Sequence, residues 1–354
     1  MRFLNRFRDD FGKMEVTEIS AQDHQPMTIR KPDRLVQWPE QFGRRFLITI
    51  DTEEEFDWNA PFQSSGHTTV SVAKLQEFQT FAETYDVKPI YFVDYAIIQD
   101  DAAAAFLKGV TEEQSALVGV HLHPWVNPPF EEEVNVHNSF AGNLPKALEE
   151  QKLVILRDAI CDKIGVAPTI FRAGRYGMGP HTMELLIKHG FVLDSSIRPR
   201  FDYSEQGGPD FLAVGSEPFW WNDDKRLLEV PLTTVYSGLL RKQAGLAAAI
   251  MEKYPLANAL LSRSKMLERI PLTPEGISAR ETKEAIDVAL DDDLQLLVFS
   301  FHSPSLSPGY TPYVRTQADL DGFYDWWRDV LAHLKARNVR PLEIGELMTA
   351  AGGV

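Results

Sequence analysis

The sequence predicts an α/β fold in which a parallel sheet is covered by helices. Short apolar segments typical of strands alternate along the chain with segments whose apolar residues recur at helical spacing. Polar residues stand at or just beyond the C-terminal ends of five of these strands. They are Asp51, His121, Arg172, Asp194 and His302. Because α/β barrels build their active sites at that end of the strands, these positions are candidates for one common site.

The expected elements follow from periodicity and from the residues that end them. Apolar segments predict strands at 46–50, 88–98, 116–123, within 168–177, and at 192–196, 294–303 and 339–342. Helical spacing predicts helices at 69–85, 144–165, 181–191 and 317–337. Gly165 and Gly190 are the expected C-terminal stops of two of these helices.

Three regions are expected along the chain. Residues 1–43 show no sustained period and are interpreted as an N-terminal extension. Residues 44–354 form the expected barrel domain. Within that domain, about 235–285 is expected to be a helical insertion, because 235–270 is rich in Leu, Ala, Lys and Arg.

Composition excludes several classes of protein. Hydrophobic residues make up 44% and charged residues 25% of the 354 residues, as in ordinary globular proteins. A net charge of −15 makes nucleic acids and anionic membrane surfaces poor partners. The single cysteine, Cys161, excludes a disulfide within the chain. Neither a signal-peptide pattern nor an apolar run of about 18–20 residues is found, so a cytoplasmic protein without a membrane span is expected.

Two residue pairs with i, i+2 spacing stand at strand ends and could form a metal site. Asp51 and Glu53 can face one side of a strand, and a metal hydrolase needs one carboxylate to hold the cation and another to take a proton from water. His121 and His123 offer two imidazoles, which with a carboxylate would suit catalytic Zn²⁺ or a similar cation. Each pair taken alone is also compatible with a solvated loop.

Two arginines and a further histidine are the remaining candidates that residue type and position indicate. Arg172 and Arg175 lie in the glycine-flanked segment FRAGRYG, where a guanidinium could orient a carboxylate, contact substrate or form a surface ion pair. His302 ends an apolar strand and is followed by Ser-Pro-Ser, which cannot continue that strand. Its ring is therefore expected at the barrel mouth, where it could protonate a leaving amine.

The ordered segments DTEEE, GVHLH, FRAGRYG, LDSS and FSFH resemble the five motifs of the polysaccharide deacetylase family, the NodB-homology or carbohydrate esterase 4-like family. The resemblance is strongest to its WalW-like subgroup and spans roughly residues 44–345. It implies a deformed (β/α) barrel of about seven parallel strands, and a divalent metal, usually zinc.

The resemblance also implies a role for each matched catalytic residue. Asp51 would be the base and Arg172 would brace it. His302 would be the general acid, oriented by Asp194. The backbone N–H of Tyr176 could help to bind the oxyanion.

The metal ligands depart from the family pattern. Glu53 would occupy the place of the metal carboxylate, and His121 that of the first histidine. The usual second histidine lies four positions after the first, where this chain has Trp125. His123 is the nearest replacement and His137 a distant one. The family's third motif, Arg-x-Pro-Tyr, reads Arg-Ala-Gly-Arg-Tyr here.

The expected function is metal-dependent removal of an acetyl group from an N-acetylated sugar or a surface-polysaccharide precursor. Residues next to the motifs are expected to contact a carbohydrate: Trp58, Trp125, Arg175 and Tyr176. One alternative is hydrolysis of a non-sugar amide, as in allantoinase-like and imidase-like enzymes, which would need no aromatic stacking surface. Another is a catalytically degenerate carbohydrate-binding protein, suggested by the altered histidines.

Overall fold

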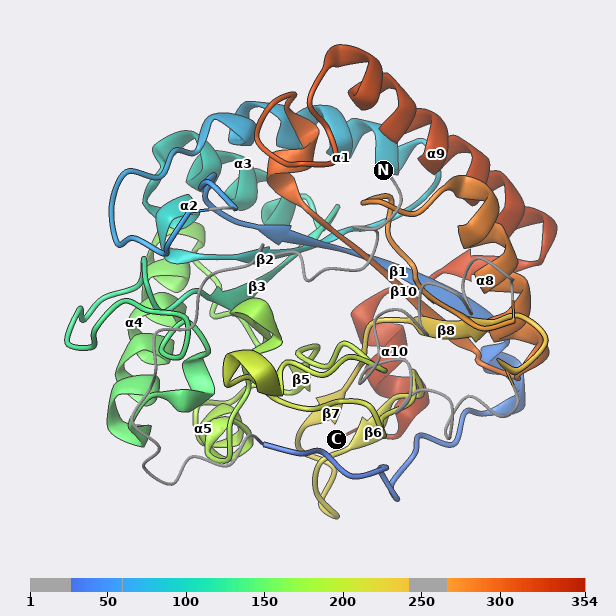
Figure 1. Cartoon of the computed structure of the whole chain (residues 1–354), viewed down its shortest axis with the longest axis horizontal. Coiled ribbons are helices and arrows are strands. Elements are labelled where there is room, and N and C mark those ends of the chain that lie inside the picture. Colours follow the sequence, from blue (N-terminus) through green and yellow to red (C-terminus); the bar gives the residue numbers. More distant parts are fainter. Residues whose placement is uncertain (1–26, 59, 242–265, 354) are drawn as a thin grey trace.

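Strand β1 (Arg44–Thr52) organises the sheet, because it pairs in parallel with β10, β2 and β11. A computed structural model describes residues 27–58, 60–241 and 266–353. In this part of the chain nine strands form one sheet in the order β10-β1-β2-β3-β4-β5-β7-β6, with β11 beside β1. The β6–β7 pair is antiparallel and the other pairs are parallel. The curled sheet with helices around it (Figure 1) confirms the predicted fold class.

The elements have the following bounds. The other strands of the sheet are β2 (Ile90–Val93), β3 (Leu117–Leu122), β4 (Ile170–Ala173), β5 (Leu193–Asp194), β6 (Phe219–Trp220), β7 (Leu228–Glu229), β10 (Leu296–His302) and β11 (Val339–Pro341). The helices include α1 (Leu75–Glu83), α2 (Tyr95–Gln99), α3 (Asp101–Glu112), α4 (Lys146–Ile164), α5 (Thr182–Lys188), α8 (Ala279–Asp291), α9 (Gln317–Ala336) and α10 (Ile344–Ala351). Short 3₁₀ turns include η1 (Glu40–Phe42), η2 (Val70–Lys74), η3 (Ala141–Asn143), η4 (Gly174–Tyr176), η5 (Ser204–Gln206) and η7 (Ser303–Leu306).

The two faces of the sheet differ, because successive strand residues point to opposite sides. On the outer face, Ile48 and Phe299 pack in one hydrophobic cluster with helix residues such as Trp327. The inner face begins apolar, with Leu47 and Val298 in a second cluster. Towards the C-terminal strand ends it becomes polar, and its buried polar residues there include Thr49, Asp51, Arg172, Ser300 and His302. The strands thus place buried polar side chains together at one end of an otherwise apolar interior.

Most predicted helices and strands are found where the sequence indicated them. Gly165 follows α4 with φ 84°, the left-handed conformation that glycine adopts without steric cost. The predicted strand 88–98 is shorter than expected. It ends at Val93, because the carboxylate of Asp94 accepts the backbone N–H of Ile97 at 2.7 Å and starts α2.

The regions outside the barrel differ in part from expectation. Described residues of the N-terminal extension form isolated bridges, Thr28 with Asp210 and Leu35 with Phe219. Within the described part of the expected helical insertion, β8 (Thr234–Ser237) and β9 (Glu268–Pro271) form an antiparallel pair, and the last residues begin helix α8. Residues 242–265, the middle of that insertion, lie outside the described residues. None of the described helices is both long and apolar enough to span a membrane.

Candidate active site

The acidic segment after β1 is buried, not solvated. Asp51, Glu53, Glu54 and Glu55 are each at most 4% exposed. The carboxylates contact different groups, because β1 ends at Thr52 and the chain leaves the sheet there. Glu55 accepts the backbone N–H groups of Val70 and Ser71 and thereby holds the start of η2. Asp51 and Glu53 lie beside histidine rings, whereas Glu54 is hydrogen-bonded to His123 and Trp125.

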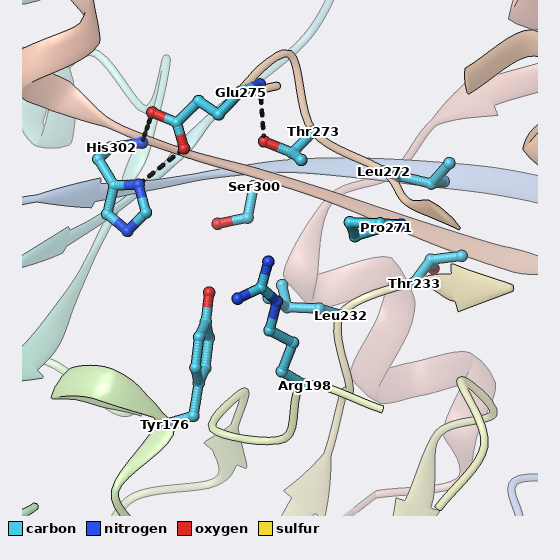
Figure 2. Close-up of a pocket in the computed structure, with 10 residues that line it drawn as sticks. All are labelled: Tyr176, Arg198, Leu232, Thr233, Pro271, Leu272, Thr273, Glu275, Ser300 and His302. Carbon is cyan, nitrogen blue, oxygen red and sulfur yellow. Dashed lines mark hydrogen bonds and ion pairs between the residues drawn. The ribbon is translucent and has the colours of Figure 1, made fainter. Parts of the chain in front are cut away.

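His302 lies beside Asp51 and is held by a glutamate that sequence reasoning missed. Strand β10 pairs with β1 so that His302 is the direct neighbour of Asp51, and His302 Nε2 lies 3.9 Å from Asp51 Oδ2. Glu275 Oε2 accepts the His302 Nδ1–H at 2.7 Å, and Glu275 Oε1 accepts the His302 backbone N–H at 3.1 Å (Figure 2). In the structure Glu275, and not the predicted partner Asp194, contacts the His302 ring.

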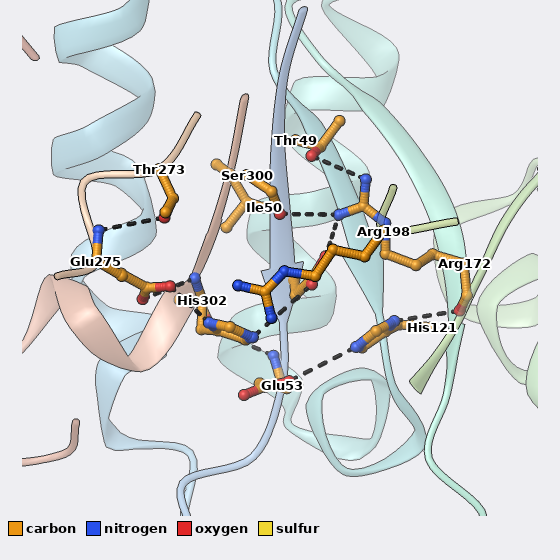
Figure 3. A network of polar contacts seen from close by, with 12 residues as sticks. Thr49, Ile50, Glu53, His121, Arg172, Arg198, Thr273, Glu275, Ser300 and His302 are labelled. Atoms are coloured by element: carbon orange, nitrogen blue, oxygen red, sulfur yellow. Dashed lines mark hydrogen bonds and ion pairs between the residues drawn. The ribbon is translucent and has the colours of Figure 1, made fainter. Parts of the chain in front are cut away.

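Arg172 crosses the interior of the curled sheet from β4 to β1 and β10. Its Nη1 is ion-paired with Asp51 and donates to Ser300 Oγ at 3.0 Å, and its Nη2 donates to Thr49 Oγ1 at 3.0 Å (Figure 3). Its Nε donates to the backbone oxygen of Ser195 at 3.0 Å. With these fixed partners and 0% exposure, Arg172 braces the Asp51 carboxylate, in the position that the motif predicted.

Glu53, His121 and His123 form a group that could hold a cation. Glu53 Oε2 lies 3.6 Å from His121 Nε2 and 3.4 Å from His123 Nε2. Two ligand atoms about 2.1 Å from one tetrahedral zinc ion lie about 3.4 Å apart, so the spacing fits. His121 Nδ1 donates to the backbone oxygen of Arg172 at 3.2 Å, which leaves the Nε2 lone pair for a metal.

Burial and charge in this group also fit a cation. Glu53 Oε1 is buried and has no hydrogen-bond partner among the described residues. Burial raises the pKa of Glu53 well above its usual value, and the negative charges of Glu54, Asp51 and Asp94 add to the rise. Burial lowers the pKa of His121 to about 3 and that of His123 to about 4. Neutral imidazoles can bind a divalent cation directly, and Glu53 would join them as a carboxylate when the cation displaces its proton.

The acid and base candidates have opposite pKa shifts. Burial acts to raise the pKa of Asp51, but the positive charge of Arg172, aided by His121 and His302, outweighs it and leaves this pKa below its usual value. Burial acts to lower the pKa of His302, but the negative charges of Glu275 and Glu53 outweigh it and leave this pKa well above its usual value. The site therefore contains an ionised carboxylate next to an imidazolium, the arrangement that general base and general acid require.

Asp194 lies on the other half of the sheet, next to Glu229. Its Oδ1 accepts a hydrogen bond from Ser196 Oγ at 2.5 Å, and Ser196 Oγ accepts the backbone N–H of Ala173 at 2.8 Å. Burial raises the pKa of Asp194 to about 6, although the hydrogen bond from Ser196 opposes the rise. Burial and the charge of Asp194 raise the pKa of Glu229 well above its usual value.

Two of the predicted substrate-binding residues line spaces at the barrel mouth. The Tyr176 hydroxyl points into a small pocket of about 20 Å³, which His302, Ser300 and Arg198 also line (Figure 2). The Trp58 ring meets His302 edge to face, with ring centroids 5.1 Å apart. Trp58 also lines a wider, open cleft of about 610 Å³ together with Tyr310.

The other two predicted substrate-binding residues are buried. Arg175 is 4% exposed, donates to Ser139 and Gln206 and lies over the Phe140 ring. Trp125 is 2% exposed. The structure thus favours a role for both in holding the loops around the site, and contact with substrate stays a prediction.

His137, the alternative metal histidine, lies apart from the candidate metal ligands. His137 contacts Asn143 Nδ2 at 3.4 Å and belongs to neither group of candidate metal ligands among the described residues. A second such group, Glu54, Asp94 and His123, adjoins the first.

Ser300 was missed although it stands two positions before His302 on the same strand face. Glu275 lies in a loop without periodicity, and no sequence signal pointed to it.

No family model matches the chain, and no curated protein matches it by sequence. Among solved structures, 34 chains match. A candidate polysaccharide deacetylase from Mycobacterium smegmatis is 16% identical with a TM-score of 0.46, covering 88% of this chain and 97% of that chain.

Two further matches cover similar shares. The peptidoglycan N-acetylglucosamine deacetylase Bc1960 is 11% identical with a TM-score of 0.42, covering 88% of this chain and 89% of that chain. A family 4 acetyl xylan esterase from Clostridium thermocellum, solved with a cobalt ion, is 13% identical with a TM-score of 0.41, covering 88% of this chain and 93% of that chain. The WalW-like subgroup stays a prediction. In these comparisons the chain is similar to polysaccharide and peptidoglycan deacetylases and to family 4 carbohydrate esterases.

Proposed function

We propose that the chain is a metal-dependent hydrolase of the polysaccharide deacetylase type, which removes an acetyl group from an N-acetylated sugar or a surface-polysaccharide precursor. One observation supports this most strongly. A carboxylate braced by Arg172 and an imidazole held by Glu275 face each other at the same barrel mouth that holds Glu53, His121 and His123. Amide hydrolysis needs these three parts: a base, an acid and a stabiliser of the carbonyl oxygen.

Each part has a distinct task in the proposed reaction. A divalent cation, which we propose to be Zn²⁺, would polarise the amide carbonyl and make water more acidic when bound by Glu53 and the two histidines. Asp51 accepts a proton from the attacking water. His302 donates a proton to the amide nitrogen as the C–N bond breaks, so the amine leaves uncharged and acetate is the second product.

The surroundings of the site support a carbohydrate substrate. The cleft of about 610 Å³ is wide enough for a sugar residue and is lined by polar groups and by Tyr310 and Trp58, whose ring contacts His302. A small sugar nucleotide or a lipid-linked precursor suits the expected cytoplasmic setting. A non-sugar amide hydrolase would not need this aromatic cleft. A degenerate binding protein would not need an acid and a base in contact, so the deacetylase is preferred.

The replacement Asp51→Asn tests the proposal. The amide has nearly the same shape as the carboxylate and keeps a hydrogen-bonding group beside Arg172, but it cannot take up a proton. We expect loss of nearly all release of acetate from N-acetylglucosamine oligomers, by roughly 10²–10⁴-fold. Zinc content should match that of the parent and the variant should still fold, although loss of the buried ion pair with Arg172 should lower the midpoint of thermal unfolding.

Asp158→Asn, the same change at an exposed position of α4, is the control and should keep parental turnover. Parental turnover by Asp51→Asn would remove Asp51 from the role of base. A parent that binds acetamido sugars but releases acetate from none of them, nor from other amides, would favour the binding protein.

A further inference from the structure

Gly174, at the start of η4, passes very close to the ring of His123. A Cβ atom at position 174 would lie 2.4 Å from His123 Cδ2 and 2.6 Å from the backbone oxygen of Leu122, distances that real Cβ contacts essentially never show. Because one of these atoms belongs to the backbone, a shift of a flexible side-chain end would not relieve the clash. Position 174 therefore requires glycine for close approach to the segment that carries His123.

Glu54 and Trp125 hold His123 from other directions. Glu54 Oε2 accepts a hydrogen bond from His123 Nδ1 at 2.9 Å, and Trp125 Nε1 donates to Glu54 Oε1 at 2.7 Å. The Trp125 ring stacks on His123, with ring centroids 4.2 Å apart and planes inclined by 28°. Since Nδ1 is taken up by Glu54, the remaining nitrogen of His123, Nε2, is turned towards Glu53 Oε2 at 3.4 Å.

We infer that Gly174, Glu54 and Trp125 are positioning residues that make His123 the second histidine ligand of the cation site. This inference rests on the metal-dependent function proposed above. It names the residues that hold the second histidine ligand in place. Trp125 stands where the resembled motif has its second histidine, and Gly174 stands where the resembled motif has proline. The two departures are complementary, because the His123 ring occupies the space that a proline side chain at position 174 would need.

Gly174→Ala is the first test, measured as affinity for Zn²⁺ by equilibrium dialysis and as the visible absorption of bound Co²⁺, which reports ligand geometry. We expect a loss of about 10–100-fold in affinity, the usual effect of disturbing residues that orient a metal ligand. The control is Gly322→Ala on α9, where an added Cβ meets nothing within 4 Å, and it should bind like the parent. Thermal unfolding of the metal-free proteins shows whether each variant folds.

A double-mutant cycle separates positioning from a general structural role. His123→Ala removes the ring but not the contact with the Leu122 oxygen, so Gly174→Ala added to it should cost clearly less affinity than it does in the parent. If Gly174 has only a general structural role, Gly174→Ala should lower the affinity for Zn²⁺ by the same factor with and without His123→Ala, and that outcome would overturn the inference. A Co²⁺ spectrum that is unchanged in Gly174→Ala would overturn it as well.

Glu54→Gln provides a second cycle should Gly174→Ala fail to fold. Glutamine keeps the size of the side chain but lacks the negative charge that holds Nδ1–H, so affinity should fall by about tenfold or more in the parent and not in the His123→Ala background. Equal loss in both backgrounds would contradict the inference. His121→Ala distinguishes the two proposals, since parental affinity in that variant would overturn the metal site itself, whatever the cycles show.

Discussion

Both halves of the sheet end in buried carboxyl groups, but only one half surrounds them with imidazoles. On β1 and the adjoining loops, Glu53 and Asp51 face His121, His123 and His302. On β5 and β7, the neighbours Asp194 and Glu229 are register partners in the same sheet and equally buried.

The second pair accepts hydrogen bonds from groups other than histidine. Ser196 Oγ donates to Asp194, while the backbone N–H of Ile197 and the indole N–H of Trp221 donate to Glu229, both at 3.2 Å. Even so, Asp194 Oδ2 is buried without a hydrogen-bond partner among the described residues, as Glu53 Oε1 is. The comparison teaches that burial of carboxyl groups alone does not indicate chemistry. The orientation of nearby imidazole nitrogens separates a candidate catalytic group from a structural one.

The largest effect is expected from His302→Gln. If His302 donates the proton to the leaving nitrogen, amide cleavage should slow by roughly 10²–10⁴-fold. Hydrolysis of an activated ester such as 4-nitrophenyl acetate should suffer much less, because its leaving group needs no proton. Glu229→Gln, a change in the other carboxyl pair, should alter neither rate strongly. Equal loss by His302→Gln on both substrates, with metal still bound, would assign His302 another role.

A smaller effect, on pH dependence, distinguishes the two candidate partners of His302. A general acid is active while protonated, so the rate falls as the pH rises through the raised pKa of His302. Glu275→Gln removes the main charge that raises this pKa, and the alkaline limb of kcat should move down by about 1–3 pH units. Asp194→Asn should leave the limb in place. A shift in Asp194→Asn and none in Glu275→Gln would restore the partner predicted from sequence.

The smallest effect is on stability. The folded-state pKa of Asp194, about 6, lies above the usual value of 3.8, so the folded protein retains a proton that the unfolded chain loses in this range. The free energy of unfolding of the parent should therefore fall as the pH rises from about 4 to 6. Asp194→Asn removes this loss and should gain roughly 1–3 kcal/mol on the parent between pH 4 and pH 7.

Urea unfolding of the parent and Asp194→Asn at the two pH values measures this gain. Asp158→Asn, at an exposed position, should show no such change relative to the parent. A difference between Asp194→Asn and the parent that is independent of pH would contradict a raised pKa of Asp194 in the folded protein.

The sequence by itself determined the architecture and the positions of most candidate groups. Apolar strands alternating with amphipathic helices specify a parallel sheet, and the polar residue that ends each strand must then lie at one edge, because parallel strands have their C-terminal ends together. The i, i+2 spacing likewise determined that Asp51 and Glu53, or His121 and His123, share a face.

Only the tertiary structure decided which of these groups meet. The pairing of Arg172 with Asp51 depends on how strongly the sheet curls, and the curl brings β4 opposite β1 although two strands separate them. Glu275 reaches His302 from a loop before α8, a contact between segments with no common periodicity. The space that Gly174 leaves for His123 likewise exists only where two chain segments pack. The pattern of residues in a strand determines which side of the sheet each side chain faces. Which residues meet across the barrel depends on packing and backbone curvature, and these cannot be predicted from a local pattern.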